Sequence, residues 1–249
     1  MKKRFISIKE EFSSLSLFER LFDIFTVLAM VTVTMISVIR KDDIMLILQL
    51  CLNIAASLSL FLTHFLFKTT SLFGSLSLRC QKYINIIVLI GSFGGQYFAL
   101  GRYYSNYDTM THLVTGSLVC FIGYYIYEFY AEEPAYKKPM LCSTYCYFIS
   151  MTAALLWELF EFGSDFLLGS TCQGYNLGLK TDKFFYFRWF SFAQRPEMQY
   201  ALYDTFADLF AAFITASVTA AVISAVLKKR HKTALTESRE TVAENTLTV

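Results

Sequence analysis

Three short segments of the chain each hold a pair of side chains that can bind a cation or transfer a proton. The six residues are Asp108 and His112, Glu158 and Glu161, and Asp204 and Asp208. The members of each pair are three or four positions apart, which places them on one face of a helix. Five carboxylates and an imidazole cannot all be ionised in a confined space without a cation or shared protons. The pattern therefore predicts a polar site that binds a divalent metal ion.

Oxygen ligands joined by a single histidine favour Mg²⁺, Mn²⁺ or Ca²⁺, and the imidazole leaves Zn²⁺ or Fe²⁺ open as well. Such a metal acts as a Lewis acid or activates water, with Glu158 or Glu161 as the general base. The sequence has no His-Glu-x-x-His motif of zinc proteases and no pair of Glu-x-x-His motifs of di-iron bundles. It also offers no Ser–His or Cys–His pattern for nucleophilic catalysis. We expect metal-dependent chemistry on a phosphate-bearing or lipid-linked substrate.

The composition places these residues in a membrane protein. Of the 249 residues, 55% are hydrophobic and 17% are charged, whereas soluble domains carry about 25% charged residues. The formal net charge of +2 is too small to indicate a nucleic acid or another polyanion as a partner. These values exclude a disordered protein and an ordinary cytosolic enzyme, and they indicate a polytopic protein embedded in the lipid bilayer.

Six stretches are long and apolar enough to cross a hydrocarbon core, which takes about 20 residues in a helix. They are Leu21–Ile39, Ile44–Phe67, Tyr83–Leu100, Thr109–Tyr130, Met140–Leu168 and Tyr203–Leu227. Lipid cannot satisfy the backbone of an open sheet, and a barrel would show shorter, alternating segments. The sequence therefore predicts an all-α integral membrane protein, with a bundle of six transmembrane helices over residues 21–227.

The Lys and Arg residues in the connections predict the orientation of this bundle. The two tails and the second and fourth connections hold fifteen of them, and the opposite side holds seven. The side richer in Lys and Arg is the cytoplasmic one. We expect both termini in the cytoplasm and the protein in a plasma membrane of bacterial type.

Three segments outside the spans have distinct patterns. Residues 1–20 carry the apolar stripe Phe5, Ile8, Phe12 and Leu15 of an amphipathic helix on the inner leaflet. Residues 228–249 are polar and are expected to be disordered. The connection 169–199 contains an aromatic run, Phe184–Phe190, of the kind that rests at the membrane–water boundary. A lid that covers a substrate is the alternative for this run.

The expected topology brings the six candidate ligands to one depth. The fourth and sixth helices start outside, so their Asp and His residues lie in the first turns. Glu158 follows Met140 by about 27 Å of helix and so reaches the same outer boundary. Glu128 belongs to the cytoplasmic end instead. Continuing from Asp208 in steps of four gives a row of small residues that favours close helix packing: Ala212, Ala216, Ala220 and Ser224.

Other interpretations of these residues remain open. Asp108 and Asp204 stand where helices are expected to begin, and Asp there caps the backbone or interacts with the helix dipole. Capping does not account for His112, Asp208 or the glutamate pair. The same carboxylates suit a cation- or proton-coupled transporter, for which Glu128 and His64 are the candidates on the inner side. A membrane assembly protein without turnover is the third alternative.

The order Asp-x-x-x-His, Trp-Glu-x-x-Glu and Asp-x-x-x-Asp-Leu on successive helices resembles the YjdF-like family of uncharacterised bacterial inner-membrane proteins. The matching residues are Asp108, His112, Trp157, Glu158, Glu161, Asp204, Asp208 and Leu209. The resemblance covers residues 80–227, and the long aromatic fifth connection departs from it. The first element is also similar, more weakly, to one in VanZ-like membrane proteins. The resemblance implies a shared polar site and no established reaction.

Overall fold

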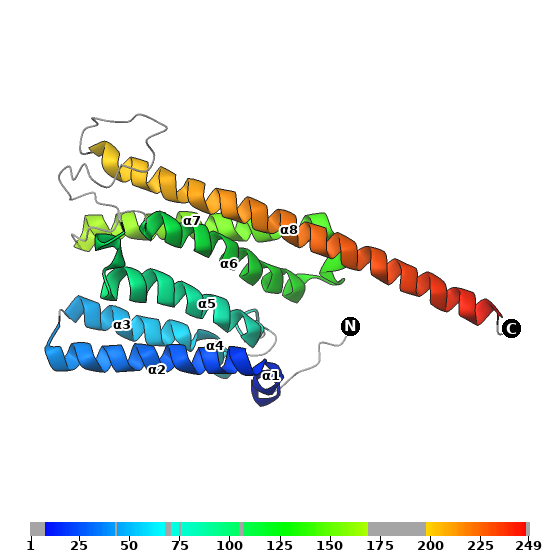
Figure 1. Cartoon of the computed structure of the whole chain (residues 1–249), viewed down its shortest axis with the longest axis horizontal. Coiled ribbons are helices and arrows are strands. Elements are labelled where there is room, and N and C mark those ends of the chain that lie inside the picture. The colour runs from blue at the N-terminus through cyan, green and yellow to red at the C-terminus, as the bar shows by residue number, and fades with distance from the viewer. Residues whose placement is uncertain are drawn as a thin grey trace.

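The computed structural model describes residues 8–42, 44–67, 71–74, 76–104, 107–168 and 198–247. These residues form helices and connecting turns, without a strand among them. Figure 1 shows the helices side by side along one bundle, with α2, α3 and α5 on one side and α6, α7 and α8 on the other. The prediction of an all-helical membrane protein is confirmed.

The N-terminal part is a short helix followed by a helical hairpin. Helix α1 (Ile8–Ser14) leads into α2 (Leu17–Arg40), where Ser16 and Glu19 form a capping box. Helix α2 ends at Lys41, whose φ of 57° places it in the left-handed conformation that closes many helices. The chain then reverses into α3 (Ile44–Ser57), which packs along α2.

The second expected span is a broken helix. Helix α4 (Ser59–Leu66) follows α3 after a bend of 66°. The side chain of Gln81 bridges the bend, because its Oε1 accepts the Leu60 N–H at 2.9 Å and its Nε2 donates to the Ala56 carbonyl at 3.1 Å. Backbone groups freed by a break inside a membrane need such partners. The side chain of Gln81, from the next helix, therefore stabilises the bend by satisfying two of its backbone groups.

The third expected span is a composite of two helix types. Helix α5 (Gln81–Ile87) continues as the π-helix η2 (Val88–Tyr97). The Tyr107 hydroxyl donates to the Ile90 carbonyl at 2.5 Å and occupies the space that a Cβ on Gly94 would need. The π-helix η2 thus packs against the start of α6.

Four of the described helices are long and apolar enough to cross a membrane. These are α2, α6 (Tyr107–Tyr130), α7 (Pro139–Leu168) and α8 (Met198–Leu247). The bent pair α3 and α4 makes a fifth candidate. The expected span Tyr83–Leu100 is not one helix of that length, because it is divided into α5 and η2, with seven and ten residues. The short 3₁₀ turns are Leu78–Cys80, Leu100–Arg102 and Ala135–Lys137.

Helices α6, α7 and α8 pack against one another around a core of small residues. Cys120, Cys146 and Ala216 are fully buried at its centre. The predicted row on α8 is confirmed, since each of its four members is buried: Ala212, Ala216, Ala220 and Ser224. Small residues let the helix backbones approach closely without a hydrophobic driving force between them. This three-helix unit carries the candidate site.

The N-terminal stripe lies partly in helix α1, and the C-terminal end of the chain differs from the sequence-based expectation. Ile8 and Phe12 pack against a protein cluster that includes Leu60 and Leu78, so this part of the stripe contacts protein. Helix α8 continues to Leu247 and extends beyond the bundle in Figure 1, although residues 228–249 were expected to be disordered. No Pro or Gly interrupts residues 228–247, so nothing local ends the helix. The aromatic run Phe184–Phe190 lies outside the described residues.

Candidate metal centre

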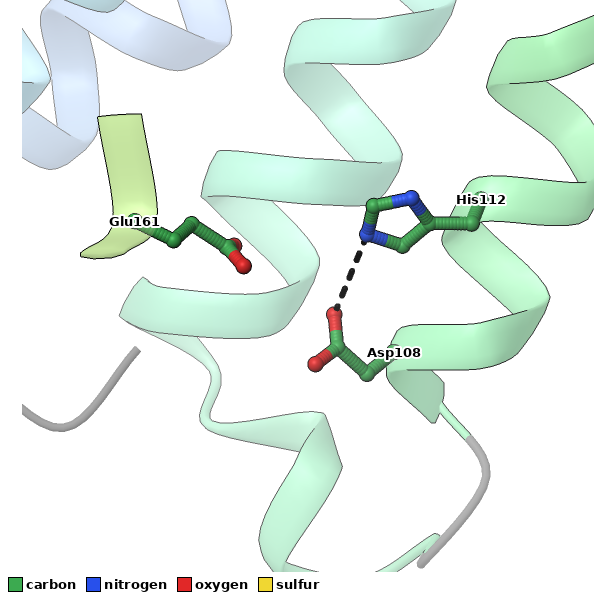
Figure 2. Close-up of side chains that lie close together, drawn as sticks. All are labelled: Asp108, His112 and Glu161. Atoms are coloured by element: carbon green, nitrogen blue, oxygen red, sulfur yellow. Dashed lines mark ion pairs between the residues drawn. The ribbon is translucent and has the colours of Figure 1, made fainter. Parts of the chain in front are cut away.

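The first pair of candidate ligands lies in the first two turns of α6. The hydrogen bond of Tyr107 to η2 fixes the start of this helix. Asp108 and His112 then follow one turn apart on the same face, and Asp108 Oδ1 lies 3.9 Å from His112 Nε2. Figure 2 shows this pair together with Glu161, whose carboxylate points from α7 toward the same space. The site is therefore built between helices.

The second pair lies near the end of α7. Glu158 and Glu161 are 3% and 7% exposed, which is unusual for carboxylates and requires compensation. Glu161 receives a hydrogen bond from the Trp157 indole nitrogen at 2.8 Å. This bond fixes the direction of the Glu161 carboxylate, and it connects the tryptophan of the sequence motif to the site.

The third pair lies near the start of α8, and a close helix contact aligns it with α6. A Cβ on Gly116 would lie only 2.5 Å from Thr215 Oγ1 and 3.0 Å from the Ala212 carbonyl oxygen. The Ser150 hydroxyl of α7 donates to the Gly116 carbonyl at 2.7 Å. All three helices thus meet at Gly116, one turn beyond His112. Asp208, one turn before Ala212, is thereby held opposite His112.

His112 lies at the centre of the cluster. Its Nε2 is 3.8 Å from Glu158 Oε1 and 4.0 Å from Asp208 Oδ2, in addition to the contact with Asp108. These separations are too long for hydrogen bonds. They suit ligand atoms that share a cation between them, because a metal stands about 2.0–2.6 Å from each nitrogen or oxygen ligand.

All six predicted ligands come together in the structure. They form three overlapping groups whose ligand atoms lie within 4.8 Å of one another. The groups are Asp108, His112 and Glu161; His112, Glu158 and Asp208; and Asp108, Asp204 and Asp208. Their convergence at one end of the three-helix unit is the arrangement expected from helix length and spacing. The role of the residues as metal ligands stays a prediction.

The cluster has a closed side and an open side. Asp208 is 2% exposed, and its Oδ1 has no hydrogen-bond partner within the part of the chain that the structure describes. Asp108, by contrast, keeps 48% of its side chain accessible, and Asp204 is also only partly buried. Asp208 therefore lies on the side of the cluster that protein encloses, whereas Asp108 and Asp204 lie on the side that is reachable from outside the bundle.

Helix capping does not account for this arrangement. Asp204 lies six residues after Met198, the first residue of α8, and so is well inside the helix. Asp108 does lie in the first turn of α6, where the dipole favours a carboxylate. Asp108 also contacts His112, which gives its carboxylate a partner besides the helix dipole. The capping interpretation thus holds for one of the two aspartates at most.

Glu128 and His64, the candidate residues on the inner side, both have structural partners. Glu128 accepts the Ala135 N–H at 2.9 Å and so closes the turn between α6 and α7. His64 Nδ1 lies 2.7 Å from the Leu60 carbonyl, and its Nε2 faces Glu11 at 3.5 Å. Neither residue reaches the six-residue cluster. These contacts leave no role for the two side chains in the site itself.

A second buried polar network was missed by the sequence analysis. Asn85 donates to Asp23 at 2.7 Å and accepts from Gln81 at 3.1 Å, and all three side chains are buried between α2 and α5. The signal for it was an acidic residue, Asp23, inside the first apolar stretch, with one amide inside the third stretch and another just before it. The network supports the bend between α3 and α4 through Gln81.

Comparison with known proteins identifies the family. Residues 22–229 match the family described as "Predicted membrane protein (DUF2238)", and the chain therefore belongs to this family. The resemblance to YjdF-like proteins is thereby confirmed, whereas the weaker likeness to VanZ-like proteins stays a prediction. No curated protein and no solved structure shows a significant match to the chain. The family description gives a membrane location and no reaction.

Proposed function

We propose that this member of the DUF2238 family is a divalent-cation-dependent enzyme of the plasma membrane that acts on a phosphate-bearing or lipid-linked substrate. The observation that carries the proposal is the convergence of five carboxylates and one imidazole from α6, α7 and α8. Asp208 strengthens it, because a buried carboxylate oxygen that receives no hydrogen bond from any described residue needs a cation or a proton. Mg²⁺, Mn²⁺, Ca²⁺ and Zn²⁺ all fit this mixture of oxygen and nitrogen ligands.

The proposal includes the orientation of the bundle. Six membrane crossings, with α5 and η2 as the third, put both termini in the cytoplasm and the cluster at the outer face. Two features support this. The basic part of α8 after Leu227 and the turn between α6 and α7 lie away from the start of α8, and α5 with η2 runs beside the long helices in Figure 1.

The side chains of the cluster have different roles in the proposed reaction. A bound cation polarises a phosphoryl oxygen or lowers the pKa of water, and the ligands hold it in a fixed place. Glu161 is the better placed general base, because Trp157 directs its carboxylate and it lies within 4.8 Å of the His112 and Asp108 ligand atoms. Glu158 is more deeply buried and serves as a ligand to the cation.

The surroundings of the cluster favour a substrate that reaches it from the lipid. Phe160 and Phe206, which neighbour the ligand residues in sequence, expose 61% and 64% of their surface. In a membrane such side chains contact acyl or isoprenoid chains. The partly accessible Asp108 and Asp204 lie on the open side of the cluster. A lipid tail against the helix surface would thus leave its phosphate beside the cation.

The proposed activity is tested by phosphate release from purified protein in lipid vesicles. The substrates are a polyprenyl diphosphate and a phosphatidic acid, each supplied with Mg²⁺ or Mn²⁺ or with a chelator. We expect cation-dependent release that Glu161→Gln lowers by about 100-fold or more. The matched control is Glu132→Gln, an exposed carboxylate outside the cluster, which retains full activity. Cation binding without turnover of either substrate would contradict the enzymatic proposal.

A cation transporter is the second candidate, and the helix break favours it. Transporters commonly use discontinuous helices near polar residues, and α3 and α4 bend by 66° beside the buried amide of Gln81. The transporter and the enzyme are distinguished with lipid vesicles that carry the protein in their membrane and enclose a dye that Mn²⁺ quenches. Uptake that requires Asp208 supports transport, whereas a static dye signal together with phosphate release supports the enzyme.

A further inference from the structure

We infer that the cluster holds two divalent cations, one enclosed and one accessible, with Asp208 as the bridging ligand between them. The inference rests on the proposed function to the extent that it requires cation binding at these residues. It adds the number of ions, the ligands of each and the part of the site that meets the substrate.

The ligand groups divide naturally into two sites. The enclosed group is His112, Glu158 and Asp208, all buried, and the accessible group is Asp108, Asp204 and Asp208. Asp208 is the only residue that both contain. A single cation reaches ligand atoms up to about 5 Å apart. Among the described residues the six ligands satisfy that limit in groups of three, and not as one group of six.

The charge of the cluster favours two divalent ions over one. Its five carboxylates carry a formal charge of −5 when ionised. One divalent cation leaves three negative charges unbalanced, whereas two leave one. Uncompensated charge in a buried site is strongly unfavourable, and Glu158, Glu161 and Asp208 are all buried. Two ions thus allow the carboxylates to remain ionised as ligands.

Asp208 has the geometry that a bridge needs. Its Oδ2 lies 4.0 Å from His112 Nε2, a separation that suits two ligands of the same enclosed ion. Its Oδ1 is buried and has no hydrogen-bond partner in the described part of the chain, so it is available to a second ion. A bridging carboxylate holds two metals about 3.5–4 Å apart in enzymes that transfer or hydrolyse phosphates.

The third group of ligand atoms has a different role. It joins Glu161 to Asp108 and His112, and each of those two residues already belongs to one cation site. Glu161 is also engaged by the Trp157 N–H. We therefore assign no third ion. Glu161 lies within 4.8 Å of one ligand of each site, Asp108 and His112, where it could accept a proton from water that the bound ions would activate.

The number of ions is measured by titrating purified protein with Mn²⁺ and recording its electron paramagnetic resonance spectrum. We expect about two Mn²⁺ per chain and the exchange-coupled signal of two ions that share a ligand. Asp204→Asn retains the enclosed ion alone, so the stoichiometry falls to one and the coupling disappears. The matched control Glu132→Gln retains both ions and the coupling.

The wild-type titration decides the inference without relying on any variant. One Mn²⁺ per chain, or two without exchange coupling, overturns the bridged pair while leaving a cation-dependent function intact. No bound Mn²⁺ overturns the proposed function as well. In folded protein, a loss of both ions in Asp204→Asn contradicts the assignment of separate ligand sets.

Discussion

Asp208 is the most constrained side chain of the cluster. Its carboxylate is nearly inaccessible, faces His112 and lies among further acidic residues on α6 and α7. Burial of a carboxylate near like charges is unfavourable unless a cation or a proton compensates for it. The proposed function therefore predicts that cation binding at Asp208 stabilises the folded protein.

Replacing the Asp208 carboxylate by an amide shows separately how this group affects the stability of the cation-free protein and how it affects cation binding. Without cations, Asp208→Asn should be at least as stable as the wild type, because one buried negative charge is removed. At a Mn²⁺ concentration about 100 times the dissociation constant, the wild type should gain about 2.7 kcal/mol for each ion bound, and the variant should gain nothing. Denaturant unfolding in detergent, with and without Mn²⁺, measures both quantities. A variant that is stabilised as much as the wild type would remove Asp208 from the site.

Glu11 provides a second residue-scale test at the opposite end of the chain. Burial acts to raise the pKa of its carboxyl, but hydrogen bonds and the charge of His64 act more strongly together, so the pKa lies below its ordinary value of 4.5. The bonds come from His64, the Ser77 hydroxyl and the Leu78 N–H. They attach α1 to the turn before α5.

A carboxyl whose pKa is lowered by folding stabilises the structure fully above its ordinary pKa and less as the pH falls through the folded value. We expect α1 to detach as the pH falls below 4.5. A fluorophore at Lys9→Cys would show this as lower anisotropy while the bundle stays helical by circular dichroism. The labelled double variant, Lys9→Cys with Glu11→Gln, should show low anisotropy at every pH. If the anisotropy of the Glu11 protein is independent of pH, the attachment does not depend on this carboxylate.

Among the helices, the contact of α6 with α8 at Gly116 positions the cluster. A methyl group at this position would collide with Thr215 and the Ala212 backbone, and the backbone atoms have little freedom to move. Overpacking of this kind costs about 1–3 kcal/mol. Because His112 and Asp208 lie one turn away, the same displacement separates their ligand atoms.

We therefore expect Gly116→Ala to lower both thermal stability and Mn²⁺ affinity. Gly163→Ala is the matched control, since a Cβ there meets no atom within 4 Å and alanine favours a helix over glycine. Thermal unfolding and Mn²⁺ titration compare the two. Equal affinities in both variants would show that the close contact does not position the ligands.

The sequence predicted those features of the helices that depend on local spacing. Pairs three or four positions apart placed Asp204 beside Asp208, and the alanine row indicated the buried face of α8. The bend between α3 and α4 was not predictable, because Ser57, Leu58 and Ser59 contain no helix breaker and the supporting side chain, Gln81, comes from another helix. The distances within the cluster likewise depend on packing between helices, which no local pattern encodes.

At the scale of the whole molecule, the bundle has two chemically different ends. The six ligands gather where α6 and α8 begin and α7 ends. The basic part of α8 after Leu227 extends from the other end, where α1 also lies in Figure 1. Because basic residues prefer the cytoplasm, we propose that the cluster faces outward.

This orientation is tested with a membrane-impermeant maleimide on intact spheroplasts. We expect labelling of Asp42→Cys, in the turn between α2 and α3, because this turn shares the outer side with the cluster. Glu132→Cys, in the turn between α6 and α7, should react only after the membrane is permeabilised. The wild type, with its native cysteines, provides the background. The reverse pattern would place the cluster in the cytoplasm.

The most direct test of the account is the metal content of detergent-purified protein, measured by mass spectrometry. The wild type is compared with His112→Ala and Asp208→Ala after each is shown to be folded. The account predicts about two divalent ions per chain in the wild type and a clear loss in both variants. Wild-type protein without stoichiometric metal, or equal metal in all three proteins, would contradict a metal centre at these residues.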